Sequence, residues 1–286
     1  REEGGVGSCS RLYREQHYRT STAKPAMTFW EHLDELRGSL IRMAVAVVAC
    51  AIVAFLFKEE LFDIILAPQD EGLITYRLLD KISQALMPSV ALTMEGLDVQ
   101  LINTGLAHQF LLHVRASLYA GVLVTSPYLI YQLFRFVSPA LYAHERSQAI
   151  RLVGWGYLLF MLGVLVSYLL IFPIVFRFLG TYQVSTAVAN TITLESYMSS
   201  LMSITLAMGI LFEIPALCWV LGRMGIINGT LMSRYRRHVI VALLIVAAII
   251  TPTSDVFTLT LVALPMWLLY EAGILIVKKT NRQIDG

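Results

Sequence analysis

The sequence predicts an all-α membrane protein in which six kinked transmembrane helices form a concave bundle, with both termini in the cytoplasm. Three observations favour this class. Hydrophobic residues make up 57% of the 286 residues and charged residues only 15%, whereas a soluble domain carries about 25% charged residues. Six apolar segments recur along the chain. Lysine and arginine gather in the segments on one side of them.

A helix that crosses a bilayer needs about 20 mostly apolar residues. Segments of this kind occupy residues 39–57, 116–136, 152–173, 197–221, 237–251 and 256–277. The fifth is short, because its uninterrupted apolar part, residues 239–250, gives only about 18 Å of helix. It is either a full span or a core helix that does not reach both interfaces.

Prolines within or at the ends of five spans predict the kinks, since proline removes a helical hydrogen bond and bends the helix. They are Pro127, Pro173, Pro215, Pro252 and Pro265. Kinked helices suit the walls of a concave surface, although ordinary bundles contain them too.

The orientation follows from the basic residues. All but five of the 22 lysines and arginines lie in the N-terminal region, the 137–151 and 222–236 loops and the C-terminal region, or at the span ends beside them. Cytoplasmic loops carry such an excess. We therefore expect both termini inside, and residues 58–115, 174–196 and 252–255 outside.

The organisation outside the spans is simple. We expect residues 27–280 to form one transmembrane domain, residues 1–26 a disordered or non-native extension, and residues 281–286 a cytoplasmic tail. Thr28 and Glu31 fit a capping box at the first helix. The outer loop 58–115 contains helical spacing near residues 78–86. It is either a solvated cap packed on the span ends, which we favour, or a binding domain.

Charged residues inside a membrane are costly, so those that occur usually face a bundle interior or a cavity. Glu213 is the deepest, near the middle of span four, and Pro215 beside it frees backbone carbonyls. We expect a functional role for Glu213 rather than a passive hydrogen bond. Glu271 lies in the inner half of span six. Asp255, between spans five and six, is either a helix N-cap or a functional acid.

Two charged clusters lie on the cytoplasmic side of the predicted topology. The first is His32-Leu33-Asp34-Glu35-Leu36-Arg37 and the second Ala143-His144-Glu145-Arg146, just after Pro139. Carboxylates on separate elements could clasp guanidinium groups through paired hydrogen bonds. The alternative is ordinary interfacial charge, which the residues alone do not exclude.

Taken together, the segments resemble the TatC family, the polytopic receptor subunits of the twin-arginine protein translocase. The resemblance covers residues 27–280. Besides the two clusters, the motifs that carry it are Ala67-Pro68, Ser126-Pro127-Tyr128-Leu129-Ile130-Tyr131-Gln132, Ser138-Pro139-Ala140-Leu141-Tyr142, Phe212-Glu213-Ile214-Pro215, Thr251-Pro252 and Asp255-Val256-Phe257. Each motif is weak alone, but their order and topology are specific.

The resemblance implies a receptor in the bacterial inner membrane. The family binds twin-arginine signal peptides and helps to move folded proteins across the membrane with the proton-motive force. Its signal-contacting glutamates fall on Glu35 and Glu145, and its neighbouring motif residues fall on Leu36, Arg37, His144 and Arg146. Its intramembrane acid falls on Glu213, with Gln132 and Asp255 as further polar or partner contacts. Pro68, Pro127, Pro139, Pro215 and Pro252 take structural roles.

The resemblance also implies partners. They are signal peptides of folded cargo, single-span TatA/TatB-type subunits at spans five and six, other TatC copies and the lipid bilayer. No nucleic acid and no cofactor is expected. The chain departs from the family pattern in a longer outer loop, around residues 72–100, and in one extra residue in the turn 251–255.

Two other function classes fit the residues less well. A small-solute or ion secondary transporter would show inverted repeats, and the two halves share no motif. An intramembrane enzyme would need a nucleophile with a base, or metal ligands, at membrane depth. The six histidines lie in tails, outer segments or interfaces, and the three cysteines are scattered, so neither an enzyme nor a metal site is expected.

Overall fold

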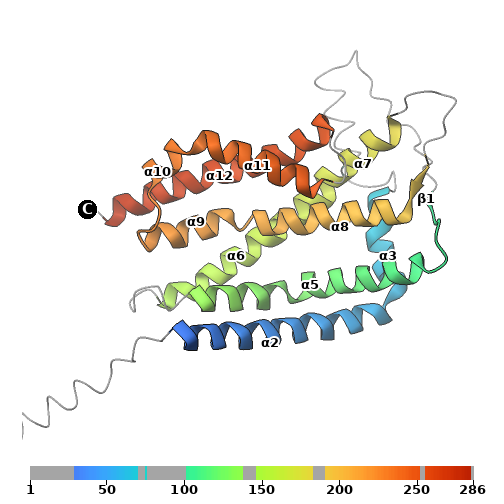
Figure 1. The fold of residues 1–286 in the computed structure, drawn as a ribbon, viewed down its shortest axis with the longest axis horizontal. Helices are drawn as coiled ribbons and strands as arrows, with labels where there is room; N and C mark the ends of the chain where they lie inside the picture. The colour runs from blue at the N-terminus through green and yellow to red at the C-terminus, as the bar shows by residue number, and fades with distance from the viewer. Residues whose placement is uncertain are drawn as a thin grey trace, which may run out of the picture. The chain divides into compact units, whose positions relative to one another are not determined.

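The computed structural model describes residues 29–69, 75, 101–137, 146–182, 191–251 and 255–284. These residues are almost entirely helical (Figure 1). The chain divides into two compact units after Arg42. The first contributes the start of helix α2 (Phe29–Leu56), and the second contains the rest of the described chain. Thr28 of the predicted capping box lies outside the described residues.

The next elements lead to the second long helix. α3 (Lys58–Leu66) and the short helix η1 (Ala67–Gln69) follow α2. Strand β1 (Leu101–Ile102) precedes α5 (His108–Val137). The predicted helical piece near residues 78–86 lies outside the described part of the chain, so the role of the outer loop stays a prediction. Tyr168 and Tyr197 donate their hydroxyls to the carbonyls of Ile64 and Ile65, which ties α3 to the span ends.

The central region holds two long helical segments. A π-helical turn interrupts the first, and a break between two α-helices interrupts the second. α6 (Arg146–Val166), the π-helical turn η4 (Ser167–Ile171) and α7 (Phe172–Thr181) form the first. Strand β2 (Ile192–Thr193) leads into α8 (Leu194–Leu211) and α9 (Ile214–Arg223), which form the second. β1 and β2 pair in parallel over two residues, a small strand pair that the all-helical prediction did not include.

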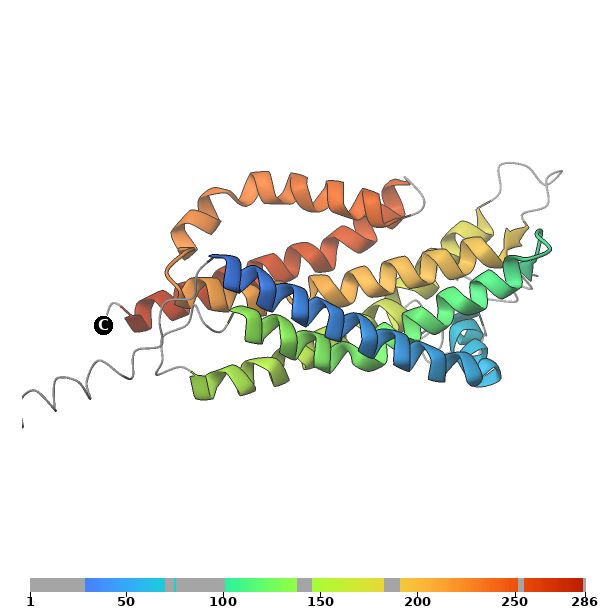
Figure 2. The ribbon, with the colours of Figure 1, turned by 60° about the horizontal axis from the view of Figure 1, so that its bottom comes forward.

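The C-terminal region is a short helix folded onto a long one. α10 (Gly229–Arg234) and α11 (Arg236–Ile250) precede α12 (Val256–Ile284). α11 lies beside α12 and α9 packs closely on α12 (Figures 1 and 2). With 15 residues, α11 spans about 22 Å, less than the roughly 30 Å of bilayer hydrocarbon. This agrees with the predicted weakness of the fifth span.

The core centres on α8, whose buried side chains recur at helical spacing and which packs mainly against α6, α5 and α7. Its main members are Tyr197, Met198, Leu201, Ile204, Met208, Phe172, Val175, Met266 and Ile274. α6 reaches α8 through Gly163, where an added Cβ would lie 2.7 Å from the carbonyl oxygen of Met208. A side chain at that position would therefore push the two helices apart.

Side-chain hydroxyls satisfy the carbonyls that two prolines leave free. Pro127 sits inside α5 and cannot bond to the carbonyl of Leu123, four residues back. The hydroxyl of Ser126 donates to that carbonyl at 2.7 Å. Likewise the carbonyl of Leu169, four residues before Pro173, accepts a hydrogen bond from the Thr75 hydroxyl. These bonds let proline stand inside long helices, as membrane helices commonly allow.

Four helical segments of the described chain are long and apolar enough to cross a membrane. They are Leu36–Leu56, Val153–Thr181, Leu194–Arg223 and Val256–Thr280, and they contain or largely overlap the predicted spans 39–57, 152–173, 197–221 and 256–277. The predicted span 116–136 lies inside α5, and 237–251 coincides with α11. Neither is among the four, so the count of six spans stays a prediction.

Candidate functional site

The candidate site centres on a break in the apolar segment of residues 194–223. α8 ends at Leu211, and Phe212 and Glu213 form a turn before α9 begins. Pro215 explains the break, because it has no N–H to bond to the Leu211 carbonyl. The amide of Glu213 bonds to the carbonyl three residues back, at 3.1 Å, instead of four. The kink that the sequence predicts at Pro215 is therefore present.

Glu213 projects from this break into an apolar contact between helices. The residue is only 7% exposed, and neither carboxyl oxygen has a hydrogen-bond partner among the described residues. Its neighbours include Gly156 of α6. A Cβ added to Gly156 would lie 3.0 Å from one carboxyl oxygen and 3.0 Å from the Phe134 ring of α5. Three helices thus meet around one unpaired carboxyl group.

This arrangement has a chemical consequence. Burying a polar group without a hydrogen bond is costly, and a charged residue in a membrane usually faces a partner or a cavity. The carboxyl group of Glu213 can accept a hydrogen bond when ionised and can donate one when protonated. The break therefore places a carboxyl group that has no hydrogen-bond partner among the described residues inside a long apolar segment.

Gln132 is a second buried polar residue, on α5. It is 4% exposed, and its Nε2 donates to the Tyr128 hydroxyl at 2.7 Å. Its amide oxygen has no partner in the described part of the chain. The structure buries both Gln132 and Glu213, and no hydrogen bond joins them among the described residues.

Asp255 acts as a helix cap. Its Oδ2 accepts a hydrogen bond from the backbone N–H of Thr258 at 2.7 Å, in the first turn of α12. This is the bonding pattern of an N-cap, which satisfies one of the free amides at a helix start. The sequence leaves two roles open for Asp255, a helix N-cap or a functional acid, and the structure contains the N-cap.

Glu271 forms an ion pair that joins two helices. Nε of Arg236, on α11, lies 2.7 Å from Oε1 of Glu271, on α12, and Nη2 of Arg236 donates to Oε2 at 2.8 Å. Next to this pair, the Tyr270 hydroxyl donates to the carbonyl of Met232, on α10, at 2.9 Å. Paired guanidinium–carboxylate contacts fix geometry as well as adding energy. The ion pair therefore holds α11 against α12, and the Tyr270 hydrogen bond holds α10 there.

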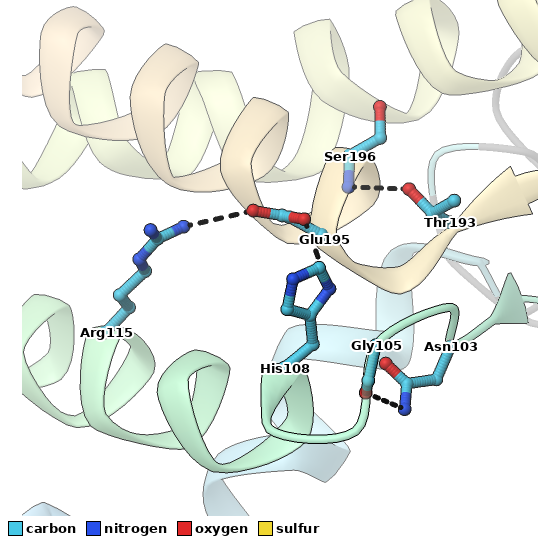
Figure 3. Close-up of polar contacts among 7 residues, drawn as sticks. All are labelled: Asn103, Gly105, His108, Arg115, Thr193, Glu195 and Ser196. Atoms are coloured by element: carbon cyan, nitrogen blue, oxygen red, sulfur yellow. Dashed lines mark hydrogen bonds and ion pairs between the residues drawn. The ribbon is translucent and has the colours of Figure 1, made fainter.

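An ionic cluster joins the start of α5 to the start of α8 (Figure 3). Nδ1 of His108 lies 3.4 Å from Oε2 of Glu195, and Nη1 of Arg115 lies 3.5 Å from Oε1 of the same residue. Thr193 caps α8 by accepting the N–H of Ser196 at 3.2 Å. The sequence analysis missed this cluster. A usable signal was the seven-residue spacing of His108 and Arg115, which puts both on one helical face.

Comparison with known proteins identifies the family. The profile described as "Sec-independent protein translocase protein (TatC)" matches residues 31–265. The chain belongs to the TatC family. The Sec-independent protein translocase protein TatC of Blattabacterium is 34% identical over 257 residues, covering 88% of this chain and 96% of that protein. The TatC protein of Aquifex aeolicus is 31% identical, covering 90% of this chain and 97% of its own.

Solved structures agree with this assignment. A crystal structure described as the twin arginine translocase receptor TatC matches with a TM-score of 0.71 and 32% identity, covering 88% of this chain and all of that one. A structure of the same receptor in detergent matches with a TM-score of 0.69. The TatC family consists of membrane-embedded translocase components. The chain is thus a translocase protein and not an enzyme, and the solute-transporter alternative is not favoured.

The structure describes the predicted TatC signal-binding residues only in part. Leu36 is half-buried and Arg37 exposed, both in the first turns of α2. Glu35 belongs to the same helix, but its side chain is outside the described set. Arg146 begins α6, again without a described side chain. His144 and Glu145 lie outside the described residues, so the predicted meeting of Glu35 and Glu145 stays a prediction.

The structure also describes only some of the prolines for which structural roles are predicted. Pro68 is buried in η1, Pro127 lies inside α5, and Pro215 is buried in the first turn of α9. Pro139 and Pro252 lie outside the described part of the chain.

Proposed function

We propose that this chain is the receptor subunit of a twin-arginine translocase, which binds twin-arginine signal peptides from the cytoplasm and carries folded proteins across the membrane with the proton-motive force. The observation that carries the proposal is the family match over residues 31–265. The description of the matching crystal structure as a translocase receptor supports it. So does the chain's own set of four long apolar helical segments.

Glu35 and Glu145 are the proposed arginine-binding groups. Glu35 lies in the first turns of α2, and Glu145 immediately precedes α6. Both are at the ends of apolar segments, on the side that holds most of the lysine and arginine. A carboxylate binds guanidinium through two parallel hydrogen bonds, and each charge-assisted bond contributes about 1.5–3 kcal/mol. Two such pairs give specificity with reversible binding. Leu36, Arg37, His144 and Arg146 complete the proposed site.

The test combines crosslinking with export. In the variant Glu35→Gln plus Glu145→Gln, signal-peptide crosslinking to the chain and export of a twin-arginine substrate are both expected to fall sharply. Asp34→Asn is the matched control, because Asp34 is an exposed acid on the same helix. Intact crosslinking and export in the double variant would refute the assignment.

Glu213 is the proposed polar contact for a partner span. Its two carboxyl oxygens at the break between α8 and α9 have no hydrogen-bond partner among the described residues. This supports the role, because a polar group of an incoming helix would satisfy them. Glu213→Ala should reduce crosslinks between this chain and a partner span, whereas Thr205→Ala, at another buried polar residue of the same apolar segment, serves as a control for local stability. Unchanged assembly and transport in Glu213→Ala would remove Glu213 from the site.

The remaining assignments complete the proposal. The chain resides in the bacterial cytoplasmic membrane with six spans and both termini inside. Its single-span TatA/TatB-type partners dock at α11 and α12, and other TatC copies join the complex. The shortness of α11 supports this docking surface, since a short span thins the bilayer locally.

A further inference from the structure

A groove lies between α5 and α8, next to the ionic cluster of His108, Glu195 and Arg115, and Arg115 belongs to both. Its volume is about 310 Å³, and its lining is mainly apolar. α5 contributes Leu112, Arg115, Leu118, Tyr119 and Val122, and α8 contributes Ser199, Met202, Ser203 and Leu206. None of these lining residues belongs to the site proposed above.

The two walls of the groove differ in polarity. On α8, Glu195, Ser199 and Ser203 recur at four-residue intervals, so they share one helical face that leads from the ionic cluster into the groove. Ser199 and Ser203 are exposed. On α5, Leu118 and Val122 present an apolar wall. A charged end, a hydroxyl-bearing wall and an apolar wall together form an amphipathic site.

The charged end can bind an anion. The side chain of Arg115 is 59% exposed, and its one described ionic contact is with Glu195, through Nη1 at 3.5 Å. A guanidinium group carries five N–H donors, so several remain for a second acceptor. Arginine prefers planar or multidentate acceptors such as phosphate. Arg115 can therefore bind a phosphate group while it stays close to Glu195.

The size of the groove limits its occupant. A helix about 10 Å wide that crossed half of a 30 Å hydrocarbon layer would displace roughly 1,000 Å³, far more than the groove provides. A single extended hydrocarbon chain is much thinner, and the lining is suited to it. Lipid is also the medium that surrounds α5 and α8 in a membrane protein.

We propose that this groove is a binding site for one phospholipid. The lipid phosphate binds Arg115 at the level of the ionic cluster. The ester groups lie near the hydroxyls of Ser199 and Ser203, and one acyl chain lies along Leu118, Val122 and Leu206. The bound lipid fills the gap between α5 and α8 and becomes part of the contact between them.

The experiment uses the full chain purified in detergent and titrated with palmitoyl-oleoyl phosphatidylglycerol in mixed micelles. Native mass spectrometry counts the phospholipids retained. Ser203→Trp fills the groove, and Val124→Trp is its control, because Val124 is exposed on α5 outside the groove lining. Arg115→Gln removes the phosphate ligand, and Arg135→Gln, near the other end of α5, is its control.

The proposal predicts that Ser203→Trp retains one phospholipid fewer than the unmodified chain. Arg115→Gln should weaken lipid binding about tenfold, as expected for the loss of one charge-assisted contact, and both controls should bind normally. Inorganic phosphate alone, at the same concentration, should not bind measurably, because the acyl chain supplies most of the contact. Equal retention by Ser203→Trp, or equal binding of inorganic phosphate, would overturn the proposal.

A second measurement covers the case in which a variant does not fold. A photoreactive phospholipid, added to membranes containing the unmodified chain, should label peptides that include residues 112–122 and 199–206. Label confined to other peptides would overturn the proposal. So would a photoreactive amino acid at position 203 that captures a polypeptide instead of lipid, because the groove would then receive a protein segment.

Discussion

At the scale of single residues, the structure explains how polar groups are accommodated between apolar helices. Ser126 and Thr75 donate their hydroxyls to carbonyls that Pro127 and Pro173 leave unbonded. Glu213 is different, because its carboxyl oxygens have no partner among the described residues. Two prolines are thus supported from within the chain, whereas the acid beside Pro215 receives no such bond from the described residues.

The Ser126 hydroxyl should therefore matter for stability. Ser126→Ala leaves the Leu123 carbonyl without a donor, and we expect a loss of about 1 kcal/mol in the free energy of unfolding. Ser233→Ala is the control, because the Ser233 hydroxyl donates to a carbonyl inside a regular helix that has no proline. Reversible unfolding of the purified chain in mixed micelles measures both variants. Equal losses would show that the proline context is irrelevant.

Close packing of α6 on α8 gives a second prediction at this scale. An added Cβ at Gly163 would lie 2.7 Å from the Met208 carbonyl oxygen and 2.8 Å from the Phe212 ring, whereas one at Gly154 would meet nothing within 4 Å. We expect Gly163→Ala to destabilise the chain by about 1–3 kcal/mol through overpacking. Gly154→Ala, on the same helix, should be neutral or slightly stabilising.

Thermal unfolding of the two glycine variants provides the comparison. If Gly163→Ala unfolded at the same temperature as Gly154→Ala, the close approach of α6 and α8 would be wrong. If Gly163→Ala lowered signal-dependent export and Gly154→Ala did not, the position of Phe212, next to Glu213, would also affect function.

At the scale of elements, the short helix α11 depends on α12 for its position. The Arg236–Glu271 ion pair and the Tyr270–Met232 hydrogen bond lie at one end of this pair of helices. Leu243 and Ala247 are the buried residues of α11, and its other apolar side chains are largely exposed. One ion pair, one hydrogen bond and a narrow packed stripe therefore hold this short helix and α10 against α12.

Exchange of the two charges tests this dependence. Arg236→Glu and Glu271→Arg should each lower the thermal stability and reduce crosslinking of a partner span to α11, since each places like charges together. The double variant should recover most of both properties. Arg237→Glu is the control, because Arg237 is exposed beside the pair and its change should have little effect. If the double variant folded but recovered neither thermal stability nor crosslinking, the ion pair would not be what positions α11.

At the scale of the whole molecule, the sequence predicted the features that depend on local pattern. Apolar length located the long helices, Pro215 marked the break in residues 194–223, and Asp255 at a helix start was recognised as a potential cap. These features follow from residue spacing and proline chemistry alone. The four helical segments long enough to cross a membrane overlap four predicted spans for this reason.

Features that depend on the rotation and pairing of helices could not be read from the sequence. The His108–Glu195–Arg115 cluster, the Arg236–Glu271 pair and the Thr75–Leu169 bond each join residues that are distant in the chain. Local spacing shows which face a residue occupies, but not which helix that face meets. For the same reason the predicted pairing of Glu35 with Glu145 requires a direct test.

That test is a comparison of signal-peptide affinities. The dissociation constants of a twin-arginine peptide and its twin-lysine counterpart are measured with the unmodified chain and with Glu35→Gln plus Glu145→Gln. Because lysine lacks the planar fork of arginine, the unmodified chain should prefer arginine by at least about tenfold, and the double variant should lose this preference. An unchanged preference for arginine in the double variant would contradict the claim that these two glutamates recognise the signal.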